Sequence, residues 1–435
     1  MSHAEFSITP LDDLIDVQRI IRIEGLAAGE KVTVTSSTPR SQQRTWHSQA
    51  SFEADAQGVV DLSQQAPVSG SYQEVSSMGL IWSQEPSDPS AAVVFPDNVL
   101  EALVTTIEVQ TQNQGLLKGT LIQRLAREGV QRIEVREEGL VGTLFLPEGE
   151  GPWPAVMILN GSGGGINEPR AALYASHGYM AFALAYFKAP GLSDYISNTP
   201  LEYFKKGLDW LRSQYKPYKN FVALNGQSRG GELVLLLASL YPKDVSAVIA
   251  YVPGAVVHSG QNAADPAVGR EGPAWLLNGQ PITHVWQDNK TATWAPFDQG
   301  PAPHRHEKAI LTALQDKEAV ARARIQVEKI QAPIIMLSGT DDGSWPSSVY
   351  SQMVKDKLQE VGFAYDVQWV DTPDAGHSII FPYVPTTQLT YTHPVSKRIS
   401  TSGGRADRNA LSNEDSWNTI KPFLQKAVAE HNELK

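Results

Sequence analysis

A strand, a Gly-X-Ser-X-Gly motif and a helix follow one another without a break between residues 221 and 240. The motif is Gly-Gln-Ser-Arg-Gly at 226–230, and it stands between an apolar run at 221–224 and an apolar helical run at 233–240. This order predicts a sharp turn from strand to helix, where the two glycines avoid side-chain clashes and the serine hydroxyl projects outward. We therefore predict that Ser228 is a nucleophile for acyl transfer.

A serine hydroxyl needs a base to take its proton and an acid to orient that base. His377 follows the apolar run 365–370 through a turn rich in Gly, Pro and Asp, and we predict that it is the base. Two carboxylates, Asp341 and Asp342, follow the preceding apolar strand. We favour Asp342 as the acid because it fits a Gly-X-X-Asp pattern. The other aspartate would then form the turn or cap the helix that begins near Ser347.

Backbone N–H groups should stabilise the oxyanion that forms during acyl transfer. We expect one from Arg229, at the N-terminus of the helix after the serine. Further donors should come from the glycine-rich loop 160–165, which follows the apolar run 155–159, and the candidates are Ser162, Gly163 and Gly164. Dinucleotide binding by this loop is disfavoured, because the Gly-X-Gly-X-X-Gly spacing and a following ribose-binding acid are not met cleanly.

A loop-rich insertion at about 255–330 is a candidate cap over the site. It carries tryptophans that could line an acyl pocket, although tryptophans in such a segment also often pack it together. The predicted substrate-binding residues are Trp275, Trp286 and Trp294. His304 and His306 are the only pair that suggests a metal, but no third ligand stands nearby. We predict no metal and no cofactor.

The elements that must position these residues alternate between apolar runs and helical segments from about residue 141 onward. Near-continuous apolar strands of this type are what a mostly parallel sheet with helices on both faces requires, which predicts the α/β class. An amphipathic helix at about 413–431 should cover the sheet. The predicted strands are 141–146, 155–159, 180–186, 221–224, 245–251, 334–337 and 365–370.

The beginning of the chain has a different pattern, in which short β-type runs are separated by turn residues. It predicts an N-terminal β-sandwich domain at 1–112, a connecting segment at 113–140 and a catalytic domain at 141–435. In the connecting segment, apolar residues at 121–126 have helical spacing and a strand follows at 130–135. The β-type runs of the sandwich are 20–23, 31–35, 45–54, 59–62, 79–82 and 92–95.

Length, charge and cysteine content limit the function classes. A chain of 435 residues exceeds a single hydrophobic core, so two domains are expected. The net charge of −11 disfavours nucleic acid or an anionic membrane as a partner, and the absence of cysteine excludes disulfides and thiolate chemistry. No secretory signal pattern and no spanning apolar run are present, so we expect a cytoplasmic protein. Oligomeric state cannot be read from these features.

Together these motifs resemble the acyl-CoA thioesterase and bile acid-CoA:amino acid N-acyltransferase family over nearly the full chain. The similar segments in the N-terminal part are 46–55, 58–62, 70–72 and 78–83. Those in the catalytic part are 160–165, 185–187, 226–232, 342–347 and 375–383. The resemblance implies a β-sandwich followed by an α/β-hydrolase fold, with Ser228 as nucleophile, His377 as base and Asp342 as acid.

The resemblance also implies an activity, the hydrolysis of an acyl thioester to a free acid and coenzyme A through an acyl-enzyme. The amidating branch of the family carries cysteine as nucleophile, so a serine favours hydrolysis, because a serine ester is more readily released to water than to an amine. Three alternatives stay open: transfer to an amine or alcohol acceptor, an esterase or peptidase that does not use coenzyme A, and an inactive binding module. The small-molecule partner is therefore an acyl thioester or ester.

Overall fold

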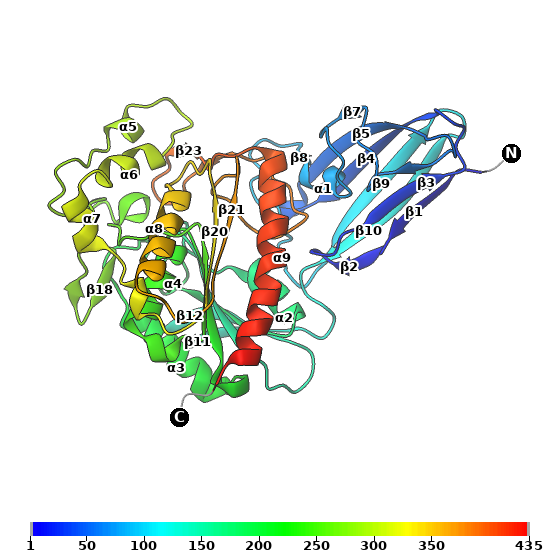
Figure 1. Cartoon of the computed structure of the whole chain (residues 1–435). Coiled ribbons are helices and arrows are strands. Elements are labelled where there is room, and N and C mark those ends of the chain that lie inside the picture. Colours follow the sequence, from blue (N-terminus) through cyan, green and yellow to red (C-terminus); the bar gives the residue numbers. More distant parts are fainter. Residues whose placement is uncertain (1–2, 433–435) are drawn as a thin grey trace. The chain divides into compact units, whose positions relative to one another are not determined.

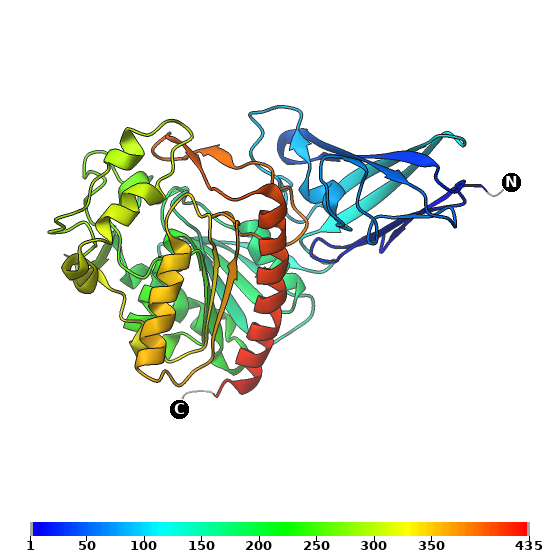
Figure 2. The same cartoon turned by 45° about the horizontal axis from the view of Figure 1, so that its top comes forward.

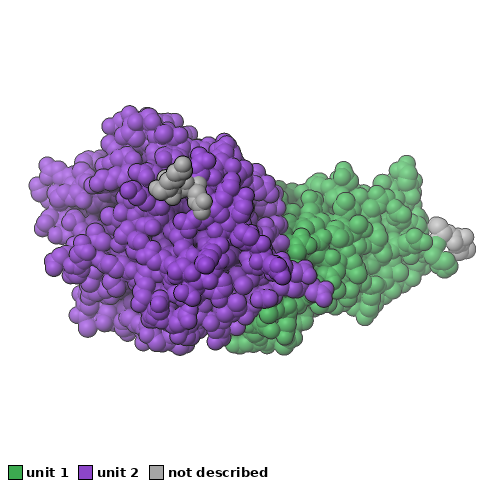
Figure 3. Space-filling view, turned by 90° about the horizontal axis from the view of Figure 1, so that it is seen from below, with its two compact units in different colours: residues 1–127, 380–389, 405–414 green, residues 128–379, 390–404, 415–435 purple. Residues whose placement is uncertain are grey.

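The computed structural model describes residues 3–432 and divides into two compact units, which Figure 3 colours separately. Each unit is assembled from segments that are distant in the sequence. Unit 1 consists of 1–127, 380–389 and 405–414, and unit 2 of 128–379, 390–404 and 415–435. The domain boundaries predicted near 112 and 140 stay predictions.

Unit 1 is a β-sandwich, as predicted. Its strands bury alternate side chains; in β5, for example, Trp46, Ala50 and Phe52 are buried. One sheet has the order β1-β3-β6, and the other β2-β10-β9-β4-β5-β7, with β8 paired to β5. The elements are β1 (Glu5–Thr9), β2 (Asp12–Leu14), β3 (Ile20–Glu24), β4 (Lys31–Pro39), β5 (Thr45–Glu53), β6 (Val60–Asp61), β7 (Ser69–Gly70), α1 (Gly79–Trp82), β8 (Glu85–Pro86), β9 (Leu103–Thr111) and β10 (Leu116–Arg124).

Three local predictions in this part of the chain are wrong. Residues 92–95, expected as a β-type run, form no strand. Residues 79–82 form the short helix α1 instead of a strand, and all four residues are buried, whereas in a strand of a sandwich buried and exposed residues would alternate. Residues 121–124, which have helical spacing in the sequence, belong to strand β10, where pairing with β9 overrides the local pattern. Strand β9 itself was not predicted.

The sheet of unit 2 has eight strands in the order β11-β12-β14-β13-β16-β17-β20-β21. β12 is antiparallel to both of its neighbours, and all pairs from β14 to β21 are parallel. This arrangement confirms the predicted α/β-hydrolase fold. The strands are β11 (Gln131–Glu137), β12 (Leu140–Leu146), β13 (Ala155–Leu159), β14 (Met180–Ala185), β16 (Val222–Gln227), β17 (Ala247–Tyr251), β20 (Ile334–Gly339) and β21 (Val367–Thr372).

Helices cover both faces of this sheet. Figures 1 and 2 show α9 on one side of strands β20 and β21 and α8 on the other. α9 packs on α2 through Trp417 and Tyr174, whose ring centroids are 5.2 Å apart. In the described part of the chain, no helix is long and apolar enough to cross a membrane. The larger helices are α2 (Glu168–Ser176), α3 (Glu202–Tyr215), α4 (Arg229–Leu240), α8 (Ser347–Glu360) and α9 (Ala406–Glu430).

Two excursions from the sheet contribute to the candidate site. The predicted insertion lies between β17 and β20, and its helices α5, α6 and α7 are grouped together in Figure 1. The second excursion is a hairpin of β22 (Thr390–Thr392) and β23 (Ile399–Thr401). The cap function of the insertion stays a prediction. Its elements are β18 (Trp275–Leu277), β19 (Gln280–Pro281), α5 (Ala295–Asp298), α6 (Glu307–Ala313) and α7 (Lys317–Ala323), and β18 also pairs with β15 (Thr199–Pro200).

Candidate active site

Ser228 lies on a tight turn between β16 and α4. Its φ of 61° and ψ of −115° are unusual for a residue with a side chain. A Cβ at Gly226 would lie 2.0 Å from the carbonyl oxygen of Gly230, and a Cβ at Gly230 would lie 2.4 Å from the carbonyl oxygen of Leu159. Only glycine fits at either position, so the predicted reason for the two glycines agrees with the packing around the turn.

The serine hydroxyl is hydrogen-bonded to His377, which is hydrogen-bonded in turn to Asp342. Nε2 of His377 lies 2.8 Å from Oγ of Ser228, and Nδ1 lies 2.8 Å from Oδ2 of Asp342. Because a carboxylate can only accept, Nδ1 carries the proton and Nε2 is left to accept from the hydroxyl. The histidine follows β21 and the aspartate follows β20, so both reach the site from the carboxyl ends of neighbouring parallel strands.

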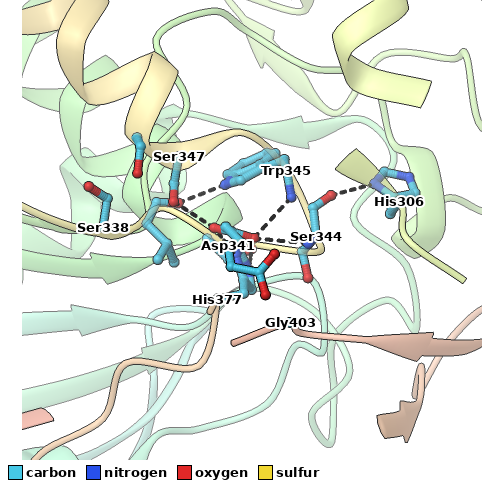
Figure 4. A network of polar contacts seen from close by, with 12 residues as sticks. His306, Ser338, Asp341, Ser344, Trp345, Ser347, His377 and Gly403 are labelled. Atoms are coloured by element: carbon cyan, nitrogen blue, oxygen red, sulfur yellow. Dashed lines mark hydrogen bonds and ion pairs between the residues drawn. The ribbon is translucent and has the colours of Figure 1, made fainter. Parts of the chain in front are cut away.

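The Asp342 carboxylate is held in one orientation by hydrogen bonds from Ser344, Trp345 and Ser347, three residues that Figure 4 labels. Its Oδ1 accepts from the backbone N–H of Ser344 at 2.9 Å and of Trp345 at 3.2 Å. Its Oδ2 accepts from the Ser347 hydroxyl at 2.6 Å in addition to His377. These donors satisfy a buried charge and fix the direction of the bond to the imidazole.

Asp341 makes different contacts and does not reach His377. Its Oδ1 accepts from Nη2 of Arg305 at 3.0 Å, and its Oδ2 accepts from the Gly404 N–H at 2.9 Å. Helix α8 begins at Ser347 without a side-chain cap, so the predicted capping function of this second aspartate is wrong. The geometry therefore separates the two carboxylates that the sequence left as alternatives.

The glycine-rich loop approaches the serine closely. A Cβ at Gly161 would lie 3.1 Å from Cβ of Ser228, and Ser162 and Gly163 line the cavity into which the serine opens. The N–H of Gly164 donates to the Gly161 carbonyl at 3.0 Å, which closes a turn. Of the three loop donors predicted for the oxyanion, Gly164 is thus already engaged, and Ser162 and Gly163 face the cavity.

A histidine from the hairpin supports this loop. Nε2 of His393 lies 2.9 Å from Oγ of Ser162, and Nδ1 accepts backbone N–H groups of 395–396 at 3.1 and 3.2 Å. Nε2 therefore carries the proton and donates to the serine. Burial, with the charges of Lys188 and Lys397, lowers the pKa of His393 to about 4. No pattern in the sequence indicated this contact, because it joins residues 231 positions apart.

Behind the serine, a buried charge cluster anchors the first turn of α4. The fully buried Glu232 accepts from Nδ1 of His258 and from Nε1 of Trp275, both at 2.6 Å, and pairs with Arg229 at 3.4 Å. Burial alone would raise the pKa of Glu232, but the charges of Arg229 and His258 lower it below its usual value. The carboxylate is therefore ionised, and it neutralises the buried guanidinium.

The three tryptophans predicted to bind substrate do not line the cavity that contains Ser228. Trp275 belongs to the Glu232 cluster, and Trp286 and Trp294 stack on each other with centroids 4.0 Å apart. Their predicted substrate-binding role stays a prediction without support from this geometry. The aromatic residues that line the cavity are Trp345 and Tyr391, which sequence reasoning missed.

Neither histidine of the His304-X-His306 pair is part of a metal cluster. Nδ1 of the buried His306 donates to the Ser344 carbonyl at 3.0 Å, and its ring also lines the cavity. Among the residues that the structure describes, no group of three or more potential His, Cys, Asp or Glu ligands is found.

The strand order and the serine at the turn between β16 and α4 define unit 2 as an α/β hydrolase by fold. Comparison with known families adds the family. The family described as BAAT / Acyl-CoA thioester hydrolase C terminal matches residues 199–430, and the Acyl-CoA thioester hydrolase/BAAT N-terminal region matches 16–137. The chain belongs to this family, which confirms the resemblance found in the sequence.

Full-length relatives agree with this assignment. The chain is 30% identical over 416 residues to acyl-coenzyme A thioesterase 1 of Rattus norvegicus, with 94% of this chain and 93% of that protein covered. It is 30% identical over 417 residues to acyl-coenzyme A thioesterase 6 of Homo sapiens, with 93% and 92% covered. Acyl-coenzyme A thioesterase 2, mitochondrial, of Mus musculus is 29% identical over 413 residues, with 94% and 86% covered.

Proposed function

We propose that the protein hydrolyses acyl thioesters, with Ser228 as nucleophile, His377 as general base and Asp342 as the acid that orients the base. The observation that carries this proposal is the continuous hydrogen-bond chain from the serine hydroxyl through the imidazole to the carboxylate, with both distances at 2.8 Å. The positive φ of the serine supports it, because strain at a buried turn is retained where a side chain must be presented to a ligand.

In the first half-reaction, Oγ of Ser228 attacks the thioester carbonyl carbon while its proton moves to Nε2 of His377. The oxyanion accepts hydrogen bonds from the backbone N–H of Arg229 and from the N–H groups of Ser162 and Gly163. The C–S bond then breaks, the thiol leaves with the proton from the imidazole, and the acyl group stays on the serine as an ester.

In the second half-reaction, water gives a proton to His377 and attacks the ester carbonyl. The second tetrahedral intermediate collapses to a free acid, and the serine oxygen regains its proton from the imidazole. Asp342 stabilises the imidazolium in each half-reaction, and its three further hydrogen bonds keep its carboxylate directed at the ring.

Thioesters are the favoured substrates because the full-length relatives are named acyl-coenzyme A thioesterases. Hydrolysis is favoured over transfer because the candidate nucleophile is a serine, whose ester reacts readily with water. The cytoplasm remains the expected compartment.

The test is Ser228→Ala with acyl-CoA substrates and detection of the released thiol. Loss of the nucleophile should lower kcat by about a thousandfold or more, and a fluorophosphonate probe should label the wild type but not this variant. Ser213→Ala, which removes a hydroxyl that donates to the Trp210 carbonyl on α3, is the matched control and should retain activity. More than a few per cent of residual activity in Ser228→Ala would contradict the assignment.

Product analysis separates hydrolysis from its alternatives. Free acid should be the main product when amines or alcohols are added, whereas an amide or a new ester would indicate an acyltransferase. Turnover of simple esters, without turnover of matched acyl-CoA thioesters, would indicate an esterase.

A further inference from the structure

The cavity beside Ser228 has a volume of about 270 Å³, and its wall combines polar groups with the rings of Trp345, Tyr391 and Pro394. Within the described ranges, no Leu, Ile, Val, Phe or Met side chain lines it. Residues from the insertion, the hairpin and the loop after β20 contribute amide, imidazole and hydroxyl groups; among them are Gln261, Asn262, His306, Ser344 and Tyr391. A saturated alkyl chain in this space would displace water from polar groups without replacing their hydrogen bonds, which costs binding energy.

His306 is one of the residues that line this cavity. Its Nδ1 carries a proton, because that atom lies 3.0 Å from the Ser344 carbonyl, which can only accept a hydrogen bond. Its Nε2 is buried without any partner in the described structure, although the ring lines the cavity and is only 6% exposed. Burial lowers the pKa of His306 to about 3, so at neutral pH the ring is neutral and Nε2 offers a lone pair.

The ring of His306 is held by aromatic neighbours. Phe297 contacts it edge to face with centroids 4.8 Å apart, and Trp294 lies at 5.7 Å. A buried acceptor with a fixed direction is what a specificity site for an O–H or N–H group requires.

Gln261 also lines this cavity. Its Nε2 is buried without a partner among the described residues, and the side chain is 7% exposed. Its backbone has a φ of 50°, and its N–H donates to the Arg270 carbonyl at 2.8 Å. A residue with a side chain is rarely held in this conformation without a reason, and such positions gather at ligand sites.

Two buried polar groups without partners, one donor and one acceptor, thus line the cavity that contains the candidate nucleophile. We propose that Gln261 and His306 form a specificity subsite for a short acyl group that carries a hydroxyl, rather than for a plain alkyl chain. The hydroxyl oxygen accepts from Gln261 and the hydroxyl proton is donated to His306. This inference rests on the proposed function, because the acyl group is attached to Ser228 while the subsite holds it.

The experiment compares 3-hydroxybutanoyl-CoA with butanoyl-CoA, which differ only in the hydroxyl. We expect kcat/KM to be at least tenfold higher for the hydroxylated substrate in the wild type. Gln261→Leu and His306→Phe should each lower this preference at least fivefold. Gln352→Leu on the exposed face of α8 is the matched control and should leave the preference unchanged.

The ratio of kcat/KM for the two substrates reports on the acyl subsite alone, because both substrates carry the same thiol part. If both groups bind the thiol part of the substrate instead, each variant lowers kcat/KM equally for both substrates, and the inference is overturned. The same holds if the wild type hydrolyses the two substrates equally. If His306→Phe does not fold, Gln261→Leu still decides the outcome. Absence of all thioester hydrolysis, with no labelling of Ser228 by a fluorophosphonate, would instead overturn the proposed function.

Discussion

Glu232→Gln removes one negative charge from the interior of unit 2 with almost no change in shape. The wild-type carboxylate accepts from His258 and Trp275, each at 2.6 Å, and faces Arg229, whose side chain is 3% exposed. A glutamine has one acceptor oxygen for two donors, and its NH₂ group would point at one of them. It also leaves the guanidinium buried without a counter-charge.

Breaking a buried ion pair from one side typically costs about 3 to 5 kcal/mol. Because the variant retains one acceptor oxygen, we expect the free energy of unfolding of unit 2 to fall by about 3 kcal/mol. For a large domain this corresponds to a fall in Tm of roughly 6 °C. The lowered pKa of Glu232 adds a second expectation. The stabilisation is fully present at pH values above the usual pKa of a glutamate, and it is lost as the pH falls through the lowered pKa of Glu232.

The assay is calorimetric unfolding of both proteins at neutral pH, with Glu328→Gln as the matched control. Glu328 forms a partly exposed i,i+4 pair with Arg324, at 2.7 and 2.8 Å, so its loss should cost at most about 1 kcal/mol. If Glu232→Gln is no more destabilising than Glu328→Gln, the cluster does not stabilise α4 through its charge, and the reasoning is refuted.

Three further predictions concern the same unit. Gly226→Ala should abolish activity and lower the free energy of unfolding by more than about 3 kcal/mol, because the added Cβ would lie 2.0 Å from a carbonyl oxygen. In the control Gly139→Ala the added Cβ meets no atom within 4 Å, so unfolding measurements should show a loss of only about 1 to 2 kcal/mol. Burial lowers the pKa of His306 to about 3 in the folded protein, so the free energy of unfolding should fall as the pH drops below about 6.5, by about 3 kcal/mol at pH 4. Denaturant titrations should show a smaller fall for His306→Phe than for the wild type. An equal fall in both proteins would show that His306 is not the titrating group. His393→Phe should lower kcat about tenfold with little change in KM, because the loop that contains Ser162 loses a hydrogen-bond donor. His393→Gln should restore part of kcat. Equal kcat values for the two variants would show that His393 does not position this loop.

The sequence was sufficient to predict the parts of the site that follow from local order. The strand, turn and helix around Ser228 are contiguous, and side chains at the carboxyl ends of neighbouring parallel strands meet at one edge of a sheet. That geometry is why the sequence alone predicts His377 and Asp342, and why the structure brings both to the serine. The choice between the two adjacent aspartates depended on which carboxylate points toward His377, and a sequence pattern indicates that direction only weakly.

Other parts depended on contacts between segments that are distant in sequence. In β9 (Leu103–Thr111), buried and more exposed residues alternate, and this local pattern is typical of a strand. By contrast, no local pattern indicates that the hairpin at 390–401 reaches the loop at 160–165, or that Trp275 binds a carboxylate 43 residues away. The tryptophans were assigned to substrate because of their type, and burial placed them in the protein interior instead.

Arg229 connects the buried cluster to the proposed chemistry. Its backbone N–H lies at the N-terminus of α4, where we propose that it stabilises the oxyanion, while its guanidinium donates to the carbonyls of residues 258 and 259 and pairs with Glu232. An unpaired guanidinium beside the cavity would attract the oxyanion but would also repel the imidazolium that His377 must form. The ion pair with Glu232 removes this conflict, because it neutralises the guanidinium. The backbone N–H groups then remain as the donors, and they stabilise the oxyanion without adding a net charge. We therefore expect Glu232→Gln, in steady-state kinetics, to change kcat more than KM.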